Sequence, residues 1–194
     1  MDIDARIAIR NIIVSLIGIG LVVLVIVLLI KGFTGGTAEP SNRVNVTKYV
    51  YDSSIATMLA DGPTVIDQDH RQARISVSNS QIEIDVIQGY QGKVIDTKSY
   101  ANNAAAYNAF LQTLQREGFS KGRTSKDDYR GFCPAGNRYV YSFSRNQDEM
   151  FKYWATSCGQ GTFEGDSDAV RQLFRRQIPP KDLSKMLNGT GINL

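Results

Sequence analysis

The residues from Ile12 to Ile30 are almost all apolar and include no charged side chain. A helix rises 1.5 Å per residue, so about nineteen residues reach across the roughly 30 Å hydrocarbon core of a bilayer. A helix also satisfies every backbone N–H and C=O within the segment, as lipid requires. We therefore predict a transmembrane helix over residues 12–30, preceded by a short tail over residues 1–11.

A secretory signal peptide is the alternative interpretation of this run. The apolar core of such a peptide usually covers about 7–15 residues and ends in a small-residue cleavage site. Gly36-Thr37-Ala38 offers such a site, but it follows a longer core and Lys31, so we expect an uncleaved anchor. The basic residues on the two sides are nearly balanced. The short tail and the cysteines favour residues 1–11 in the cytoplasm and the body outside, as in a single-pass protein of the cell membrane.

Residues 31–43 have the composition of a flexible linker, and residues 44–194 are enough for one domain with its own core. Alternating apolar residues predict strands over 74–78 and 81–86, with Asn79-Ser80 as the turn between them. A third strand follows over 93–97, which makes an antiparallel meander. Residues 44–51 are a weaker candidate for a further strand.

Helices and a second hairpin complete the predicted domain. Asn102 or Asn103 can cap a helix whose apolar stripe is Tyr107, Phe110, Leu111 and Leu114, and Gly118 suits its C-terminal end. Residues 138–144 and 151–157 predict a hairpin, and helices are expected over 166–177 and 182–187. The predicted fold class is α+β: an N-terminal transmembrane helix followed by a small domain with an antiparallel sheet and packed helices.

Cys133 and Cys158 are the only two cysteines of the chain. The predicted hairpin places both at its open end, where Cα atoms within about 7 Å permit a disulfide. Closing the loop between them would stabilise the fold by roughly 3 kcal/mol in the chain-entropy model. Stable disulfides belong to oxidising compartments, so this pairing and an external body support each other.

A catalytic thiol is the competing interpretation of Cys158. A thiolate needs a base or cation beside it, and His70 and Arg171 are the candidates. A membrane-anchored body in which a Thr-x-Cys closes a strand resembles a sortase, which is an extracytoplasmic cysteine transpeptidase. The sequence departs from that family because His70 lies in Asp67-Gln-Asp-His-Arg71 without a preceding Thr-Gly. The resemblance therefore leaves catalysis open rather than predicting it.

Two other groups of residues are candidate sites. Asp67, Asp69 and His70 could be metal ligands, but a solvated turn explains them equally well, and the sequence predicts no cofactor. Basic residues near the C-terminus form a candidate surface for an anionic partner: Arg171, Arg175, Arg176, Lys181 and Lys185. The net charge is only +3 and no nucleic-acid-binding motif is present, so nucleic acid is not an expected partner.

Two resemblances concern the whole architecture. An N-terminal apolar helix before an α+β body with a late disulfide is similar to type IV pilins. The chain lacks a Gly-Phe-type processing site and a glutamate near the start of its apolar run. Residues 154–163, Trp-Ala-Thr-Ser-Cys-Gly-Gln-Gly-Thr-Phe, with 173–179, resemble uncharacterised single-pass envelope proteins of bacteria, which implies location alone.

Taken together, the sequence predicts a membrane-anchored extracytoplasmic binding or structural domain of the cell envelope. Its expected partners are the lipid bilayer through residues 12–30 and another envelope protein or an anionic surface polymer. A cysteine transpeptidase or hydrolase and a pilin-like assembly subunit are the alternatives. The sequence does not predict an oligomeric state.

Overall fold

The computed structural model describes residues 44–194 of the chain. The elements of this part, in chain order, are η1 (Val46–Tyr49), β1 (Ser54–Asp61), β2 (Arg71–Val77), β3 (Gln81–Gln88), β4 (Lys93–Ala101), α2 (Ala104–Arg116), η2 (Tyr129–Gly131), β5 (Arg138–Arg145), β6 (Asp148–Thr156), α3 (Ser167–Arg175) and α4 (Pro180–Leu187).

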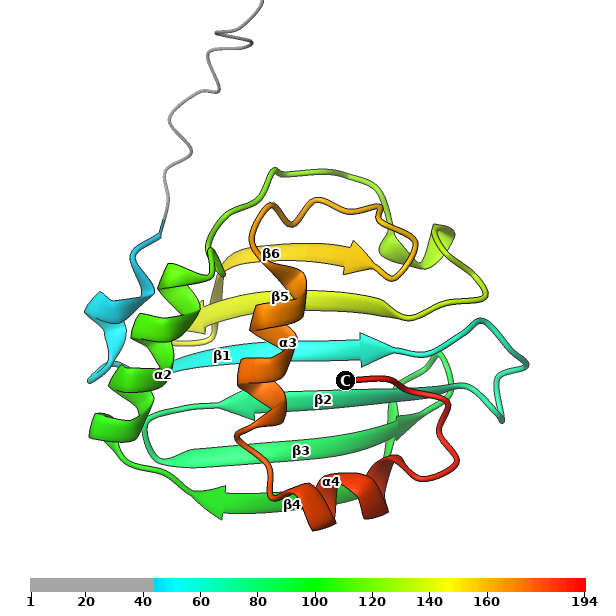
Figure 1. Cartoon of the computed structure of the whole chain (residues 1–194), viewed down its shortest axis with the longest axis horizontal. Coiled ribbons are helices and arrows are strands. Elements are labelled where there is room, and N and C mark those ends of the chain that lie inside the picture. The colour runs from blue at the N-terminus through cyan, green and yellow to red at the C-terminus, as the bar shows by residue number, and fades with distance from the viewer. Residues whose placement is uncertain (1–43) are drawn as a thin grey trace, which may run out of the picture. The chain divides into compact units, whose positions relative to one another are not determined.

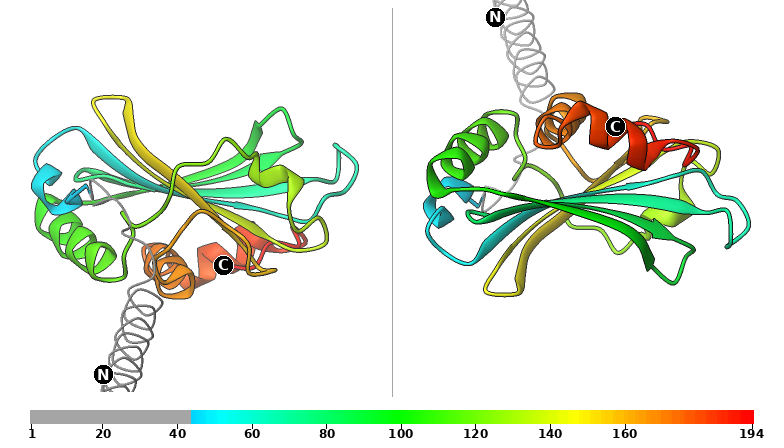
Figure 2. Two further views of the ribbon diagram at one scale, coloured as in Figure 1. Left: turned by 90° about the horizontal axis from the view of Figure 1, so that it is seen from above. Right: turned by 90° about the horizontal axis from the view of Figure 1, so that it is seen from below.

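The strands form one antiparallel sheet in the order β4-β3-β2-β1-β5-β6. Figures 1 and 2 show α2, α3 and α4 together on one face of this sheet. Apolar and polar side chains alternate along the strands, and the helices cover the apolar face. Ile75 lies opposite Ile84 with both side chains fully buried, whereas the neighbouring pair Arg74 and Asp85 points to the other face. The predicted antiparallel meander is confirmed, because β2, β3 and β4 are consecutive neighbours in the sheet.

The first strand differs from the sequence prediction. Residues 44–51 do not form a strand, because the Asn45 side chain accepts a hydrogen bond from the Thr47 N–H and caps the short helix η1. The strand lies instead at Ser54–Asp61, between β2 and β5. Its alternation is weak in sequence because apolar residues such as Met58 and Leu59 occupy both faces.

Helix α2 follows the predicted pattern. The Asn103 side chain accepts a hydrogen bond from the Ala106 N–H at 2.9 Å, and the four residues of the predicted apolar stripe are buried. Gly118 takes a φ of 80°, which a residue with a side chain adopts only with strain. The chain then places the fully buried ring of Phe119 against Tyr141, Phe151 and Phe174, at centroid distances of 6.4, 5.3 and 5.8 Å.

The predicted hairpin is present as β5 and β6, and its turn is tighter than expected because Asn146 and Gln147 both have positive φ. The remaining two helices also form where predicted, α3 with shorter bounds than 166–177 and α4 with a start two residues before the predicted 182–187. Asp166 caps α3 by accepting a hydrogen bond from Ala169, and Pro180 begins α4.

Two short segments continue the sheet beyond its β6 edge. Gly122 pairs with Phe163, and Gly161 pairs with Ala155 of β6. The chain between α2 and β5 thus passes around this edge, and Figure 2 shows η2 on the face opposite the three helices. The edge of β6 is therefore covered near Ala155, while β4 forms the other edge of the sheet.

The predicted fold class requires a correction. Within residues 44–194 no helix is long and apolar enough to cross a membrane. The physical reason is length, because the 13 residues of α2 extend about 20 Å, short of the roughly 30 Å of bilayer hydrocarbon. The predicted span over 12–30, with the tail over 1–11 and the linker over 31–43, lies outside the described residues. The fold observed is a six-stranded antiparallel sheet with three helices on one face.

Replacing Phe119 by alanine is expected to lower the free energy of unfolding by about 3–5 kcal/mol, since it removes a buried ring that packs on three others. Denaturant unfolding followed by circular dichroism measures the change. Tyr51→Ala is the matched control, because Tyr51 is 86% exposed and its loss should change stability by less than about 0.5 kcal/mol. Equal effects of the two substitutions would contradict the assignment of Phe119 to the core.

Candidate functional site

Three ionisable side chains meet in the interior where β1, β2 and β5 lie side by side. Asp61 is the last residue of β1, His70 directly precedes β2, and Arg138 is the first residue of β5. The His70 Nε2 lies 2.7 Å from the Asp61 Oδ1. The Arg138 Nε lies 3.4 Å from the Asp61 Oδ2, an ion-pair distance without hydrogen-bond geometry. We call these three residues the Asp61 cluster.

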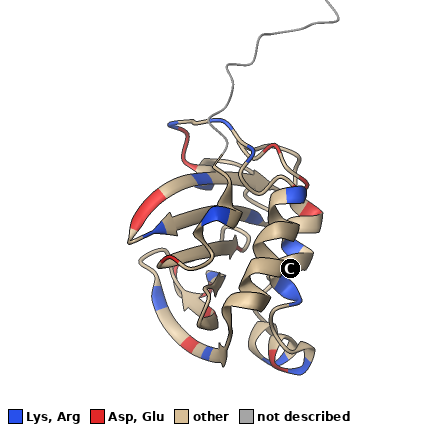
Figure 3. Cartoon of the chain, turned by 90° about the vertical axis from the view of Figure 1, so that its left-hand side faces the viewer, with Lys and Arg blue, Asp and Glu red and all other residues tan. Residues whose placement is uncertain are grey.

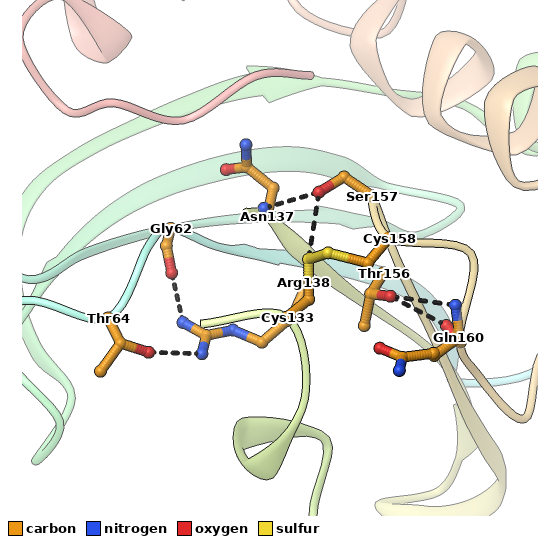
Figure 4. The surroundings of a disulfide bond; sticks show 9 residues. All are labelled: Gly62, Thr64, Cys133, Asn137, Arg138, Thr156, Ser157, Cys158 and Gln160. Atoms are coloured by element: carbon orange, nitrogen blue, oxygen red, sulfur yellow. Dashed lines mark hydrogen bonds between the residues drawn. A yellow bond between two sulfur atoms is a disulfide. The ribbon is translucent and has the colours of Figure 1, made fainter. Parts of the chain in front are cut away.

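The Asp61 cluster holds the loop that joins β1 to β2. The Arg138 guanidinium donates to the Gly62 carbonyl and, at 2.9 Å, to the Thr64 hydroxyl (Figure 4). The His70 ring stacks on Tyr90 from the β3–β4 turn, with centroids 4.0 Å apart. Because all of these partners come from different parts of the chain, the cluster fixes how three strand ends and two turns pack together.

In general-base catalysis a carboxylate can orient the histidine that takes up the proton. An Asp–His pair could therefore be catalytic if a substrate could reach the histidine. The side chains of Asp61 and His70 are 0% exposed and that of Arg138 is 1% exposed. The His70 Nδ1 has no hydrogen-bond partner among residues 44–194. A substrate could reach this nitrogen only if the surrounding loops opened, so the geometry indicates a structural role.

The predicted metal ligands do not converge. His70 is turned inward to Asp61, while the Asp67 Oδ1 accepts a hydrogen bond from the Tyr90 N–H at 2.8 Å and Asp69 is exposed. In the part of the chain that the structure describes, no three His, Cys, Asp or Glu side chains are grouped so that they could hold a metal ion. These residues form a turn rather than a metal centre.

The predicted disulfide between Cys133 and Cys158 is confirmed, with Cα atoms 5.8 Å apart. It lies at the open end of the β5–β6 hairpin, beside the pair Arg138 and Thr156. Figure 4 shows Ser157 next to it, where the Ser157 hydroxyl accepts a hydrogen bond from the Asn137 N–H at 3.0 Å. The bridge leaves no thiol on Cys158 to act as a nucleophile.

The candidate catalytic set of Cys158, His70 and Arg171 is not assembled. Arg171 lies on α3, over the helix-covered face, where its guanidinium stacks on the Tyr139 ring at 4.6 Å and pairs with Asp168. His70 is held by Asp61, and Cys158 by Cys133. Each side chain therefore has a different local partner, and the sortase-like arrangement is absent from the described residues.

Four of the five residues predicted to form a basic surface are exposed, and the fifth, Arg171, is not. Arg171 is half-buried and engaged with Tyr139 and Asp168, so it does not belong to the exposed set. Arg175, Arg176, Lys181 and Lys185 are all exposed at the end of α3 and on α4. None of these four forms an ion pair with an acidic residue within the described range 44–194. In Figure 3, blue segments lie close to the C-terminal end of the chain. We call these four residues the basic face.

The basic face borders a groove of about 410 Å³. Its lining includes Arg175, Arg176, Ile178, Pro180 and Leu183. The nearest acid of α4, Asp182, accepts hydrogen bonds from Lys98 at 2.5 Å and Tyr100 at 2.8 Å. The bond from Lys98 is the main reason that the pKa of the Asp182 carboxyl lies below its ordinary value. This carboxylate is therefore hydrogen-bonded to β4, and within residues 44–194 it forms no ion pair with any of the four cations.

Sequence reasoning missed two of the three members of the Asp61 cluster. Asp61 and Arg138 are 77 positions apart in number and become neighbours only through the register of β1 with β5. A charged residue at the end of a strongly apolar strand was the available signal, but β1 itself was not predicted. His70 was noticed, with a different role.

No protein family matches this chain, and no curated protein matches it either.

Cys133→Ser and Cys158→Ser are each expected to lower the free energy of unfolding by about 3 kcal/mol, because either substitution opens the loop that the bridge closes. Denaturant unfolding with and without a reducing agent measures this difference. The double variant should match each single variant, and the reduced native chain should match all three. A Cys133→Ser variant as stable as the native chain would contradict a structural bridge.

Asp61→Asn is expected to lower the free energy of unfolding by about 3–5 kcal/mol, because it leaves the guanidinium of Arg138 buried without a counter-charge. Asp69→Asn, in the same loop but exposed, is the control. Adding Arg138→Met to Asp61→Asn should recover part of the loss, since it removes the uncompensated charge. Purely additive losses in the double variant would show that the ion pair does not couple the two residues.

Proposed function

We propose that this chain is an extracytoplasmic binding domain of the cell envelope, held at the cell membrane, and that its basic face binds an anionic surface polymer. The observation that carries the proposal is the basic face itself: four exposed cations on two consecutive helices, with no acidic partner among residues 44–194.

The arrangement of the cations favours a polymer over a single small anion. Arg175 and Arg176 lie at the end of α3, and Lys181 and Lys185 lie on α4. The positive charges are therefore spread over two consecutive helices. The groove beside them has apolar side chains of Ile178 and Leu183 in its lining. A repeating anion would place several charges along these cations and release several counterions, which strengthens binding at low salt.

The location outside the cytoplasm rests on the disulfide. A bridge between Cys133 and Cys158 persists in an oxidising compartment and is reduced in most cytosols. The membrane attachment rests on the sequence alone, on the apolar residues from Ile12 to Ile30. A domain attached in this way meets surface polymers at high local concentration, so even weak binding sites become effective.

The test measures binding of the full chain, in nanodiscs of zwitterionic phosphatidylcholine with no net charge, to poly(glycerol phosphate). Replacing Arg175, Arg176, Lys181 and Lys185 by glutamine should weaken binding by at least about tenfold at low salt, since four charge contacts are lost. It should also flatten the dependence of log Kd on log salt concentration.

The matched control removes the same charge elsewhere. Lys48, Lys93, Lys126 and Lys152 are exposed and lie away from α3 and α4, so their glutamine variants should bind nearly as well as the native chain. Equal losses in both variants would mean that only net charge matters. Binding to vesicles containing phosphatidylglycerol but not to the polymer would replace the proposed partner with a lipid headgroup.

A further inference from the structure

A second groove lies at the β6 edge, remote in sequence from the basic face. Its volume is about 610 Å³, and it is bounded by the segments 123–127 and 159–162 with Phe132 and Trp154 between them. Trp154 lies opposite Val140 in the sheet, on the face that the helices leave uncovered. We call this hollow the aromatic groove.

The aromatic part of the groove is a stacked pair of rings. The Phe132 and Trp154 centroids are 4.8 Å apart with 34° between the ring planes. Trp154 is largely buried and Phe132 half-buried, so the pair is anchored in the domain but still contributes to the lining. The faces of such rings carry partial negative charge, which attracts the weakly positive C–H groups of a flat apolar ligand surface.

The polar part of the groove is exposed and carries no net charge. Arg123 and Asp127 contribute one charge of each sign, and Gln160 adds an amide. The Arg123 guanidinium uses one Nη to donate to the Gly161 carbonyl at 3.2 Å, and the Ser125 hydroxyl donates to the Asp127 Oδ2 at 2.7 Å. The remaining donors and acceptors of these groups are available to a ligand with several hydroxyls.

The backbone around the groove is fixed from both sides. Phe132 directly precedes Cys133, and Gly159 and Gln160 follow Cys158, so the disulfide ties Phe132 to the wall formed by residues 159–162. Gly161 passes so close to β6 that an added Cβ would lie 2.3 Å from the Trp154 carbonyl oxygen, which excludes any side chain there. A wall held in this way loses little entropy on binding a ligand.

From this juxtaposition we propose that the aromatic groove binds an uncharged oligosaccharide, one pyranose ring packing on the Phe132–Trp154 pair and its hydroxyls bonding to Arg123, Asp127 and Gln160. A sugar ring presents an apolar C–H surface and a rim of hydroxyls, which are the two chemistries that the groove combines. The balanced charge of the lining disfavours the polyanion proposed for the basic face, so the two sites select different ligands and the two proposals can fail separately.

The chain offers a direct readout, because Trp154 is its only tryptophan. Tryptophan fluorescence of the full chain in phosphatidylcholine vesicles, which contain no other protein, therefore reports on the aromatic groove alone. Titration with chitotetraose, with cellotetraose and with maltotetraose should give a saturable change in emission for at least one of them, with a Kd on the order of 1 mM or tighter. Poly(glycerol phosphate) should give no change.

Two variants test the assigned contacts. Phe132→Ala should weaken the binding about tenfold, as expected for the loss of one stacked ring, whereas Tyr51→Ala, at an exposed aromatic residue elsewhere, should not. Asp127→Ala should weaken it several-fold without affecting the fold, because Asp127 is exposed and Asp148→Ala provides the matched control. Reduction of the disulfide should lower the affinity as well.

Three results would overturn the proposal. They are the absence of any emission change with all three oligosaccharides, a change that persists unaltered in both Phe132→Ala and Asp127→Ala, and a saturable change with a peptide or with poly(glycerol phosphate) in place of the sugars.

Discussion

The buried carboxylate of Asp61 is the constraint on which the rest of this domain depends. Removing such a charge from water costs several kcal/mol unless counter-charges and donors surround it. Those partners, Arg138 and His70, come from β5 and from the loop before β2. The Asp61 carboxylate is therefore paired only when both neighbouring strands are in register with β1. Because Arg138 also holds Gly62 and Thr64, the same carboxylate determines where the loop after β1 lies.

The disulfide extends this order to the surface. Cys133 precedes β5 by a few residues and Cys158 follows β6, so the bridge fixes the chain on both sides of Arg138. The aromatic groove is built on the residues adjacent to the two cysteines, whereas the basic face belongs to α3 and α4 on the other side of the sheet. The domain thus separates a site held by a covalent bond from a site held by helix packing, and their proposed ligands differ in charge.

Local periodicity predicted the parts of the fold that depend on neighbouring residues. Alternation in β2 and β3, the stripe of α2 with its Asn103 cap, and the hairpin that brings Cys133 to Cys158 all agree with the structure. β1 was not predicted because Met58 and Leu59 make both of its faces apolar and conceal the alternation. The Asp61 cluster and the aromatic groove depend on contacts between distant segments, such as Phe132 with Trp154, which no local pattern encodes.

The way in which the two edges of the sheet end has a consequence for self-association. An open strand edge invites another chain to add a strand, which is a common route to aggregation. At the C-terminal end of β6, Gly161 pairs with Ala155, so this part of the edge is already occupied. At β4 the pairing with β3 is interrupted after Val86, and Lys93, Asp96 and Lys98 place charges along the strand. Both edges of the sheet therefore carry features that oppose the addition of a strand from a second copy of the chain.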